Sequence, residues 1–276
     1  MSDFTWIPFY KELAIKLLDY KNNRSELVDL VYSFDKTEYL HMEDKSKITD
    51  IDPFSFYGTF NRGITEDNRK NNLKKIKQFF QLDSEIPSNF DGIPILNNQK
   101  SFYFAWYSQK TLNQSCDSYW YLFEKAVNKN IQQEDIEKLA NTKGIGLAMS
   151  TMPLFWVNPD FYLPLDKNTV EYLKKNNLAT DEDITPQNYL SLLNTVKTKM
   201  QNGEISEKSF VEISSKAWKS ENTDKTYWYV GHTFGSNEPQ LSRFLEEDVW
   251  EGRFDEDKDK AQLKECLKIK VGDILI

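Results

Sequence analysis

YWYVGHTF, residues 227–234, is the stretch that decides the predicted fold, because it is the first clear strand pattern in the chain. Bulky aromatic and β-branched residues are enriched in strands. A second strand is predicted at residues 267–276, LKIKVGDILI, where Leu, Ile and Val alternate along the sequence. The chain stops directly after the Gly-Asp turn of this strand, so we expect it to be the front part of a longer protein.

Helical patterns fill the chain before this stretch. Apolar residues recur three and four positions apart from Trp6 to Val31, and again in several segments up to Met200. Thr65 is expected to cap one amphipathic helix that runs to Phe80. A polar linker, KSENTDK, separates these patterns from the strands. We therefore predict an α+β fold, with a mostly helical domain over residues 1–222 and an incomplete β module over residues 226–276.

Composition and charge limit the partners of the chain. Its 276 residues, 14% aromatic and 28% charged, indicate a folded globular protein. The net charge of -8 opposes attraction of the whole surface to nucleic acid, but a local group of cations can still bind phosphate. Solvated helix faces are the alternative interpretation of such groups. The two groups of cations are Arg62, Arg69, Lys70, Lys74, Lys75 and Lys77, and a smaller one of Lys216, Lys219 and Lys225.

The sequence lacks the features of several classes of protein. Cys116 and Cys266 lie far apart, and with only His41 and His232 beside them we predict no zinc site. The N-terminus lacks the features of a signal peptide, and no apolar run approaches the roughly 20 residues that span a bilayer. We expect a cytoplasmic protein that does not insert into membranes.

No sequence motif for nucleotide chemistry occurs in the chain. It contains neither of the glycine-rich motifs that hold phosphates, G-x-x-x-x-G-K-[ST] and G-x-G-x-x-G, and it lacks the G-x-S-x-G turn of hydrolases. We therefore expect that this chain alone does not hydrolyse NTP. We predict no catalytic residue, no metal-binding residue and no cofactor in it.

A first candidate for contact with DNA lies in the stretch quoted above. Aromatic side chains there can stack on bases, at about 1 to 3 kcal/mol per base. Because side chains alternate along a strand, at least one pair of these aromatic residues must pack in the core instead. The candidate residues in this stretch are Trp228, Tyr229, His232, Phe234 and Ser236.

A second candidate is the loop that contains Asn61, Arg62 and Arg69. Arg and Asn make bidentate contacts to base edges, and Arg also makes them to phosphate. Equally, Asn61 and Arg62 can tie a buried turn by hydrogen bonds. Both interpretations stay open.

Short motifs in the last fifty residues resemble the EVE-like, PUA-related module that precedes the motor in McrB-type AAA+ proteins of modification-dependent restriction systems. His232 stands where the pattern of that module has a small residue. Residues 4–21, 50–64, 89–98 and 154–166 resemble the helical N-terminal region of the same family. The matching positions in the module are Val230-Gly231, Gly235, Gln240, Arg243-Phe244, Trp250-Glu251 and Val271-Gly272-Asp273.

This resemblance implies a role in defence against foreign DNA such as that of phage. The chain would be the N-terminal recognition region of an McrB-like AAA+ ATPase and would bind DNA, with or without a modified base held in an aromatic pocket. A motor domain outside this chain would use ATP or GTP with Mg. That motor would form the oligomer and act with a nuclease subunit of the McrC type.

Two alternatives belong to other classes of protein. Residues 143–173 loosely resemble helix-hairpin-helix DNA glycosylases, in which a Gly-x-Gly hairpin binds backbone phosphate and a downstream Asp assists base excision. Gly144, Gly146 and Asp166 would take these roles, but the second catalytic residue of that family has no match here. A Gly-Ile-Gly between helices is also an ordinary helix end. The other alternative is a protein-interaction scaffold without affinity for nucleic acid, which the net charge of -8 favours.

Overall fold

The computed structural model describes residues 4–35, 40–42, 45–96, 109–142, 144–222, 227–228, 233–234, 238–239 and 274–275. The chain divides into two compact units, Met1–Trp218 and Lys219–Ile276.

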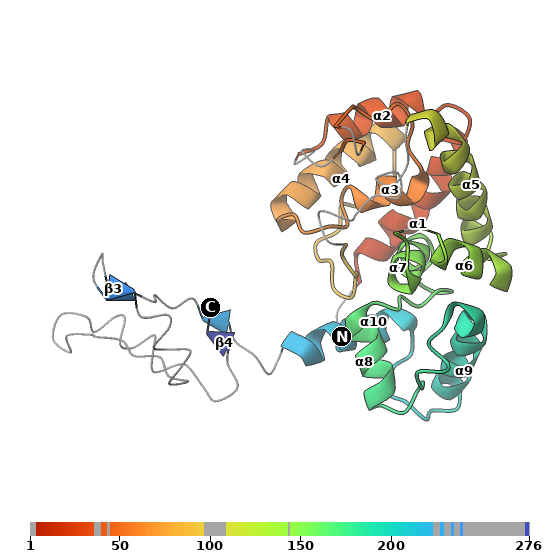
Figure 1. Cartoon of the computed structure of the whole chain (residues 1–276). Helices are drawn as coiled ribbons and strands as arrows, with labels where there is room; N and C mark the ends of the chain where they lie inside the picture. The colour runs from red at the N-terminus through yellow and green to blue at the C-terminus, as the bar shows by residue number, and fades with distance from the viewer. Residues whose placement is uncertain are drawn as a thin grey trace. The chain divides into compact units, whose positions relative to one another are not determined.

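Helices form the first unit (Figure 1). Among the described residues, the short 3-10 helices η1 (Leu18–Tyr20) and η4 (Pro186–Asn188) lie between longer helices. The α-helices are α1 (Trp6–Leu17), α2 (Ser25–Tyr32), α3 (Pro53–Gly58), α4 (Glu66–Phe80), α5 (Gln109–Val127), α6 (Gln133–Ala140), α7 (Leu147–Val157), α8 (Lys167–Lys175), α9 (Tyr189–Gln201) and α10 (Phe210–Asn222).

Local sequence decides where α4 begins and ends. The Oγ1 atom of Thr65 accepts a hydrogen bond from the N–H of Asn68 at 3.3 Å, which confirms the predicted cap. The helix ends at Phe80 because Gln81 takes the left-handed backbone conformation, with φ of 51°. The predicted amphipathic helix therefore exists with the expected bounds.

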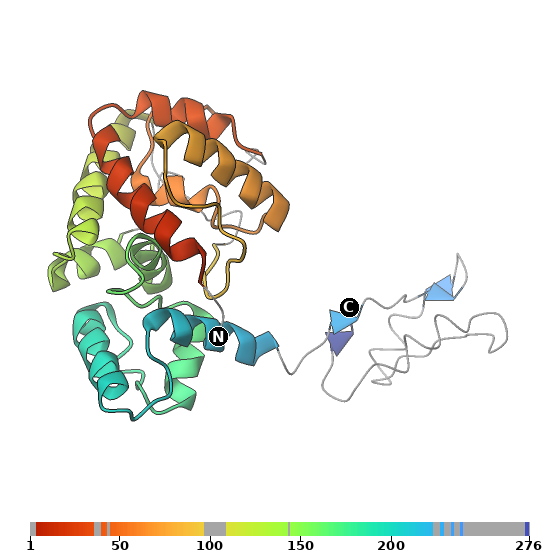
Figure 2. The same cartoon turned by 180° about the vertical axis from the view of Figure 1, so that it is seen from behind.

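The centre of the first unit is α7. Its sequence, LAMSTMPLFWV, is apolar on most sides, and every residue from Ser150 to Val157 is buried. A helix of this composition is stable only when other elements surround it. Figure 2 shows α7 in green, and α1, α3, α5 and α6 pack against it.

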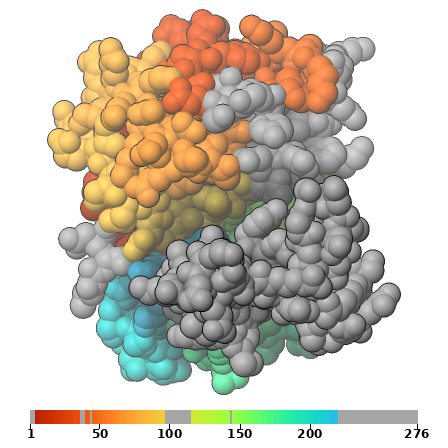
Figure 3. All heavy atoms as spheres, turned by 90° about the vertical axis from the view of Figure 1, so that its left-hand side faces the viewer, coloured from red at the N-terminus to blue at the C-terminus, as the bar shows by residue number. Residues whose placement is uncertain are grey.

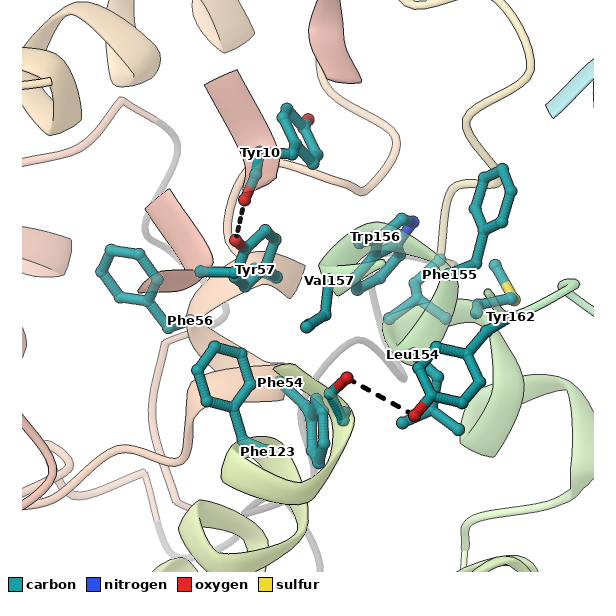
Figure 4. Packing of buried hydrophobic residues seen from close by; sticks show 14 of the residues in the cluster. Tyr10, Phe54, Phe56, Tyr57, Phe123, Leu154, Phe155, Trp156, Val157 and Tyr162 are labelled. Atoms are coloured by element: carbon teal, nitrogen blue, oxygen red, sulfur yellow. Dashed lines mark hydrogen bonds between the residues drawn. The ribbon is translucent and has the colours of Figure 1, made fainter. Parts of the chain in front are cut away.

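Aromatic rings fill the core beside α7 (Figure 4). The Trp156 ring stacks on the Tyr57 ring, with centroids 6.5 Å apart and planes inclined by 16°. Trp156 Nε1 donates a hydrogen bond to the carbonyl of Pro94 at 3.0 Å, and the Tyr57 hydroxyl donates one to the carbonyl of Tyr10 at 2.7 Å. Helix α3 and the segment around Pro94 are therefore held from inside the core.

Strands occur only as short pairs in the described part of the second unit. β1 (Tyr227–Trp228) pairs in parallel with β4 (Ile274–Leu275). β2 (Thr233–Phe234) pairs antiparallel with β3 (Glu238–Pro239). Each of these strands is two residues long.

The predicted α+β fold with an incomplete EVE-like β module is therefore wrong. Helix accounts for 58% of the described residues, and the fold is α-rich. Pairs of two-residue strands are too short to build a sheet that buries its own core. Aromatic and β-branched residues favour a strand only when neighbouring strands pack against them, so the pattern at residues 227–234 overstated the β content.

Candidate functional site

The hairpin formed by residues 141–146 joins α6 to α7 and exposes two glycines. The N–H of Ile145 donates to the carbonyl of Thr142 at 2.9 Å, which closes the turn. Ile145 is buried, whereas Gly144 and Gly146 on either side of it are exposed. Gly144 has a φ of 81°, in the left-handed region that favours glycine. One apolar anchor therefore holds a backbone loop that faces solvent.

The hairpin leaves the start of α7 accessible. Gly146 is the N-cap of α7, and no side chain accepts a hydrogen bond at this cap. A Cβ atom placed on Gly146 would meet nothing within 4 Å, so the space in front of the cap is open. The first N–H groups of a helix and the positive end of its dipole favour an anion where they are accessible.

A side chain of α7 also fixes the segment that leads to Asp166. The Thr151 hydroxyl oxygen accepts a hydrogen bond from the N–H of Leu165 at 2.9 Å and donates one to the carbonyl of Leu147 at 2.9 Å. Leu165 directly precedes Asp166. The same helix therefore carries the hairpin at its start and positions the backbone before Asp166.

The Asp166 carboxylate caps α8. Its Oδ1 accepts hydrogen bonds from the N–H of Asn168 at 3.0 Å and of Thr169 at 3.3 Å, and its Oδ2 accepts one from the Thr169 hydroxyl at 2.8 Å. Burial raises the pKa of this carboxyl, although these hydrogen bonds act in the opposite direction. Both oxygens are engaged in holding the start of α8.

The candidate residues Asn61, Arg62 and Arg69 lie in the interior. Their exposed fractions are 0%, 2% and 7%. The Tyr10 hydroxyl donates to Asn61 Oδ1 at 2.7 Å, and Arg62 Nε donates to the carbonyl of Thr59 at 3.3 Å. The structure thus brings the three residues together, in a place that a DNA duplex does not reach. This geometry favours the interpretation of a buried, hydrogen-bonded turn.

Two donors in this buried cluster have no acceptor among the residues that the structure describes. They are Arg69 Nε and Asn61 Nδ2. The Arg69 guanidinium lies over the Phe90 ring at 4.7 Å, and its Nη2 lies 3.5 Å from the carbonyl of Arg62. Burial lowers the pKa of Arg69, which reflects the loss of water around its charge.

The lysines of α4, a helix that Figure 3 shows in light orange at the surface, have partners close by. Lys70 pairs with Glu66 at 2.5 Å, and Lys75 pairs with Asp35 at 3.2 Å. Lys77 donates to the carbonyl of Ser84 at 2.7 Å. These local partners weaken the case for α4 as a phosphate-binding surface.

The aromatic candidates near the C-terminus have little described structure. The backbone of Trp228 belongs to β1 and that of Phe234 to β2. Tyr229, His232 and Ser236 lie outside the described residues. Their role in stacking stays a prediction.

One basic pocket was not predicted from the sequence. It has a volume of about 430 Å³ and is lined by Lys197 and Lys208 together with Phe210 and one acidic residue, Asp160. The Lys197 ammonium lies 4.2 Å from the centre of the Phe161 ring and 5.3 Å from that of Phe210. Burial lowers the pKa of Lys197, and the charge of Lys129 lowers it further. Separate segments supply these lysines, so no local sequence signal marks the pocket.

Comparison with known proteins gives a family but no function. A family model described as Domain of unknown function (DUF8425) matches residues 6–220. The chain belongs to this family. The DUF8425 match begins at the start of α1 and ends within α10, and it includes the hairpin. No curated protein and no solved structure matches the chain.

The described part of this DUF8425 chain was compared with the requirements of a membrane span and of a metal site. None of its helices there combines the length and the apolar character needed to cross a membrane. Those residues also contain no group of three or more His, Cys, Asp or Glu side chains that could hold a metal ion.

Proposed function

We propose that this chain binds DNA through the α6–α7 hairpin. The observation that carries the proposal is the exposed, uncapped start of α7, where Gly146 leaves room for a phosphate to approach backbone N–H groups. Such contacts hold the DNA backbone without reading its sequence. The pocket lined by Lys197 and Lys208 supports the proposal, because its two lysines exceed its one acidic residue, Asp160, and add local positive charge to an acidic chain.

The resemblance to McrB-type proteins suggests the biological setting. We propose that the chain acts in the cytoplasm as a recognition region in defence against foreign DNA. In such systems a motor that uses ATP or GTP with Mg and a nuclease subunit of the McrC type act after recognition. This chain would supply the binding step rather than the chemistry.

Binding to labelled DNA tests the proposal. Fluorescence anisotropy with unmodified and methylcytosine-containing duplexes, over a series of salt concentrations, should show affinity that falls as salt rises. Gly146→Ser should reduce the affinity about tenfold, because the serine hydroxyl would accept a hydrogen bond from an N–H group that is proposed to bind phosphate. Thr65→Ser is the matched control, since it exchanges one capping hydroxyl for another at α4 and should leave affinity unchanged.

The outcomes separate the alternatives. Unchanged affinity in Gly146→Ser would exclude the hairpin as the contact. If the chain shows no affinity even at low salt, a protein-interaction scaffold becomes the better proposal.

Base excision is a second candidate, favoured by the bond between Thr151 and Leu165 that ties the hairpin helix to Asp166. In this case Asp166 would assist departure of the base. Incubation with duplexes that carry damaged or modified bases, followed by alkaline cleavage, should reveal excision. Asp166→Asn should abolish the excision while preserving the cap of α8, because Asn caps helices as well as Asp. Full excision activity in this variant would contradict the assignment.

A further inference from the structure

We propose that the basic pocket binds a small organic phosphate, a phosphate monoester with an apolar body, through Lys197 and Lys208. The pocket lies between α9 and the start of α10, and Asp160, from the segment after α7, completes its lining. None of the residues that line it belongs to the hairpin 141–146. The inference therefore stands whether or not the chain binds DNA.

The first argument is the size and the lining of the pocket. Its volume of about 430 Å³ falls in the range of cavities that hold small organic ligands. Met200 and Phe210 supply apolar surface, and Gln201 and Ser209 add polar groups. The methylene stems of the lysines extend the apolar surface. A ligand with an apolar part and a charged part therefore matches this lining.

The second argument is that the two ammonium groups of the pocket are unpaired. Neither the Lys197 nor the Lys208 ammonium forms a salt bridge or a hydrogen bond with a residue that the structure describes. The Lys197 ammonium lies over the rings of Phe161 and Phe210, at 4.2 Å and 5.3 Å from their centres. Aromatic rings attract a cation but carry no net negative charge. Both lysines are thus available to an anion.

The third argument is the balance of charge around Lys197. The acid in the lining, Asp160, already binds the Lys11 ammonium at 2.6 Å. Burial lowers the pKa of Lys197, the charge of Lys129 lowers it further, and the charge of Asp160 opposes these effects least strongly. The charges that act on Lys197 are therefore positive on balance, and an anion in the pocket would relieve their repulsion.

The start of α10 favours the same kind of ligand. Phe210, the first residue of this helix, lines the pocket, so the positive end of the helix dipole lies there. The Glu212 carboxylate on this first turn accepts a hydrogen bond from the backbone N–H of Lys208 at 2.7 Å, which leaves the lysine ammonium free. A phosphate monoester carries about two negative charges at neutral pH and so matches the two lysines. Lysine binds phosphate as a point charge.

Isothermal titration of the full chain with phenyl phosphate tests the site, with the ionic strength held constant by chloride. Phenyl phosphate should bind about tenfold more tightly than inorganic phosphate, which lacks the apolar body. It should also bind about tenfold more tightly than benzyl alcohol, which lacks the charge.

Three lysine variants locate the bound phosphate. Lys197→Met should weaken the affinity for phenyl phosphate about tenfold, because Met keeps an apolar stem and removes the charge. Lys208→Met should weaken it about threefold, because this exposed ammonium is screened by water. Lys199→Met is the matched control on the same helix. Lys199 donates to the carbonyl of Asn177 at 2.8 Å and does not line the pocket, so the affinity should stay unchanged.

Several results would overturn the inference. Equal affinities for phenyl phosphate and inorganic phosphate would show that the apolar lining makes no contact. Unchanged affinity in both Lys197→Met and Lys208→Met, or an equal loss in Lys199→Met, would remove the anion from the pocket. Displacement of phenyl phosphate by duplex DNA would assign these lysines to the DNA-binding surface instead. If Lys197→Met does not fold, the comparison of Lys208→Met with Lys199→Met still decides the question.

Discussion

Two loops of the first unit differ in exposure, and the loop that carries a candidate arginine is the buried one. Residues 59–65 join α3 to α4 and carry Arg62, yet this arginine is 2% exposed. The hairpin 141–146 joins α6 to α7 and carries exposed glycines. The two loops differ in the segments that pack over them. The loop after α3 is covered by the segment around Leu96, whose N–H donates to the carbonyl of Asn61 at 2.9 Å, whereas the hairpin is anchored by Ile145.

The comparison separates stability from binding. Substitutions in the loop 59–65 should change the free energy of unfolding, because its polar groups are buried and hydrogen-bonded. If the hairpin binds DNA as proposed, substitutions in it should mainly change that affinity, because its exposed glycines face solvent. The following predictions test this contrast.

The largest effect is expected for Arg62→Ala. The change removes a buried side chain and the Nε donor of the Thr59 carbonyl. We expect the free energy of unfolding to fall by about 4 kcal/mol, as for other broken buried polar networks. Urea denaturation measures this loss.

A matched change beside the hairpin provides the control for Arg62→Ala. Lys138, on α6, is exposed. Lys138→Ala should therefore alter the free energy of unfolding by less than about 0.5 kcal/mol. Equal losses in the two variants would remove the contrast between the two loops.

Local patterns in the sequence predicted the helices better than they predicted the site. The helix from Thr65 to Phe80 followed from a capping residue and apolar spacing, both of which act over a few residues. Arg62 forms a bridge with Leu96, which lies far away in the sequence, and Trp156 holds Pro94 of the same segment by a hydrogen bond. The order of residues near Arg62 carries no signal of that cover, so the sequence left its role open.

The error in the predicted β content and the missed basic pocket have the same cause. A strand at residues 227–234 needs partners that its own sequence does not supply. The pocket needs α9 and the start of α10 to bring Lys197 and Lys208 together. By contrast, the Gly-Ile-Gly turn could be recognised because its three residues are contiguous. Both the predicted strand and the pocket thus depend on contacts between separate segments of the chain.

The second prediction concerns Asp52, the N-cap of the helix that leads into the buried loop. Its side chain is 0% exposed and accepts a hydrogen bond from the N–H of Ser55 at 2.8 Å. Burial raises its pKa from 3.8 to about 6. Because the folded-state pKa exceeds the unfolded one, the stabilisation is complete below about pH 4 and is lost as the pH rises through about 6.

The free energy of unfolding of the wild-type chain should therefore fall by about 2 to 3 kcal/mol between about pH 4 and pH 7.5. In Asp52→Asn this fall should be absent, because Asn does not titrate. Asn can still cap α3. Urea denaturation of both proteins at the two pH values measures the difference. Asp166→Asn, at the cap of α8, should change the pH dependence less, because Asp166 is only partly buried. A wild-type stability that rises with pH over this range would contradict the assignment to Asp52.

The smallest effect is expected within the hairpin, where the two glycines serve different purposes. Gly144 has a φ of 81°, so Gly144→Ala should lower the free energy of unfolding by about 1 kcal/mol through backbone strain. Gly146 has a φ of -98°, which any residue adopts, and its N-cap position favours Ser. Gly146→Ser should therefore raise the free energy of unfolding by a few tenths of a kcal/mol, while it weakens the proposed binding to DNA. Measuring stability and affinity in both variants separates the two roles. If both glycine variants lose stability together, the hairpin is held by its conformation alone, and the open cap of α7 loses its significance as a binding site.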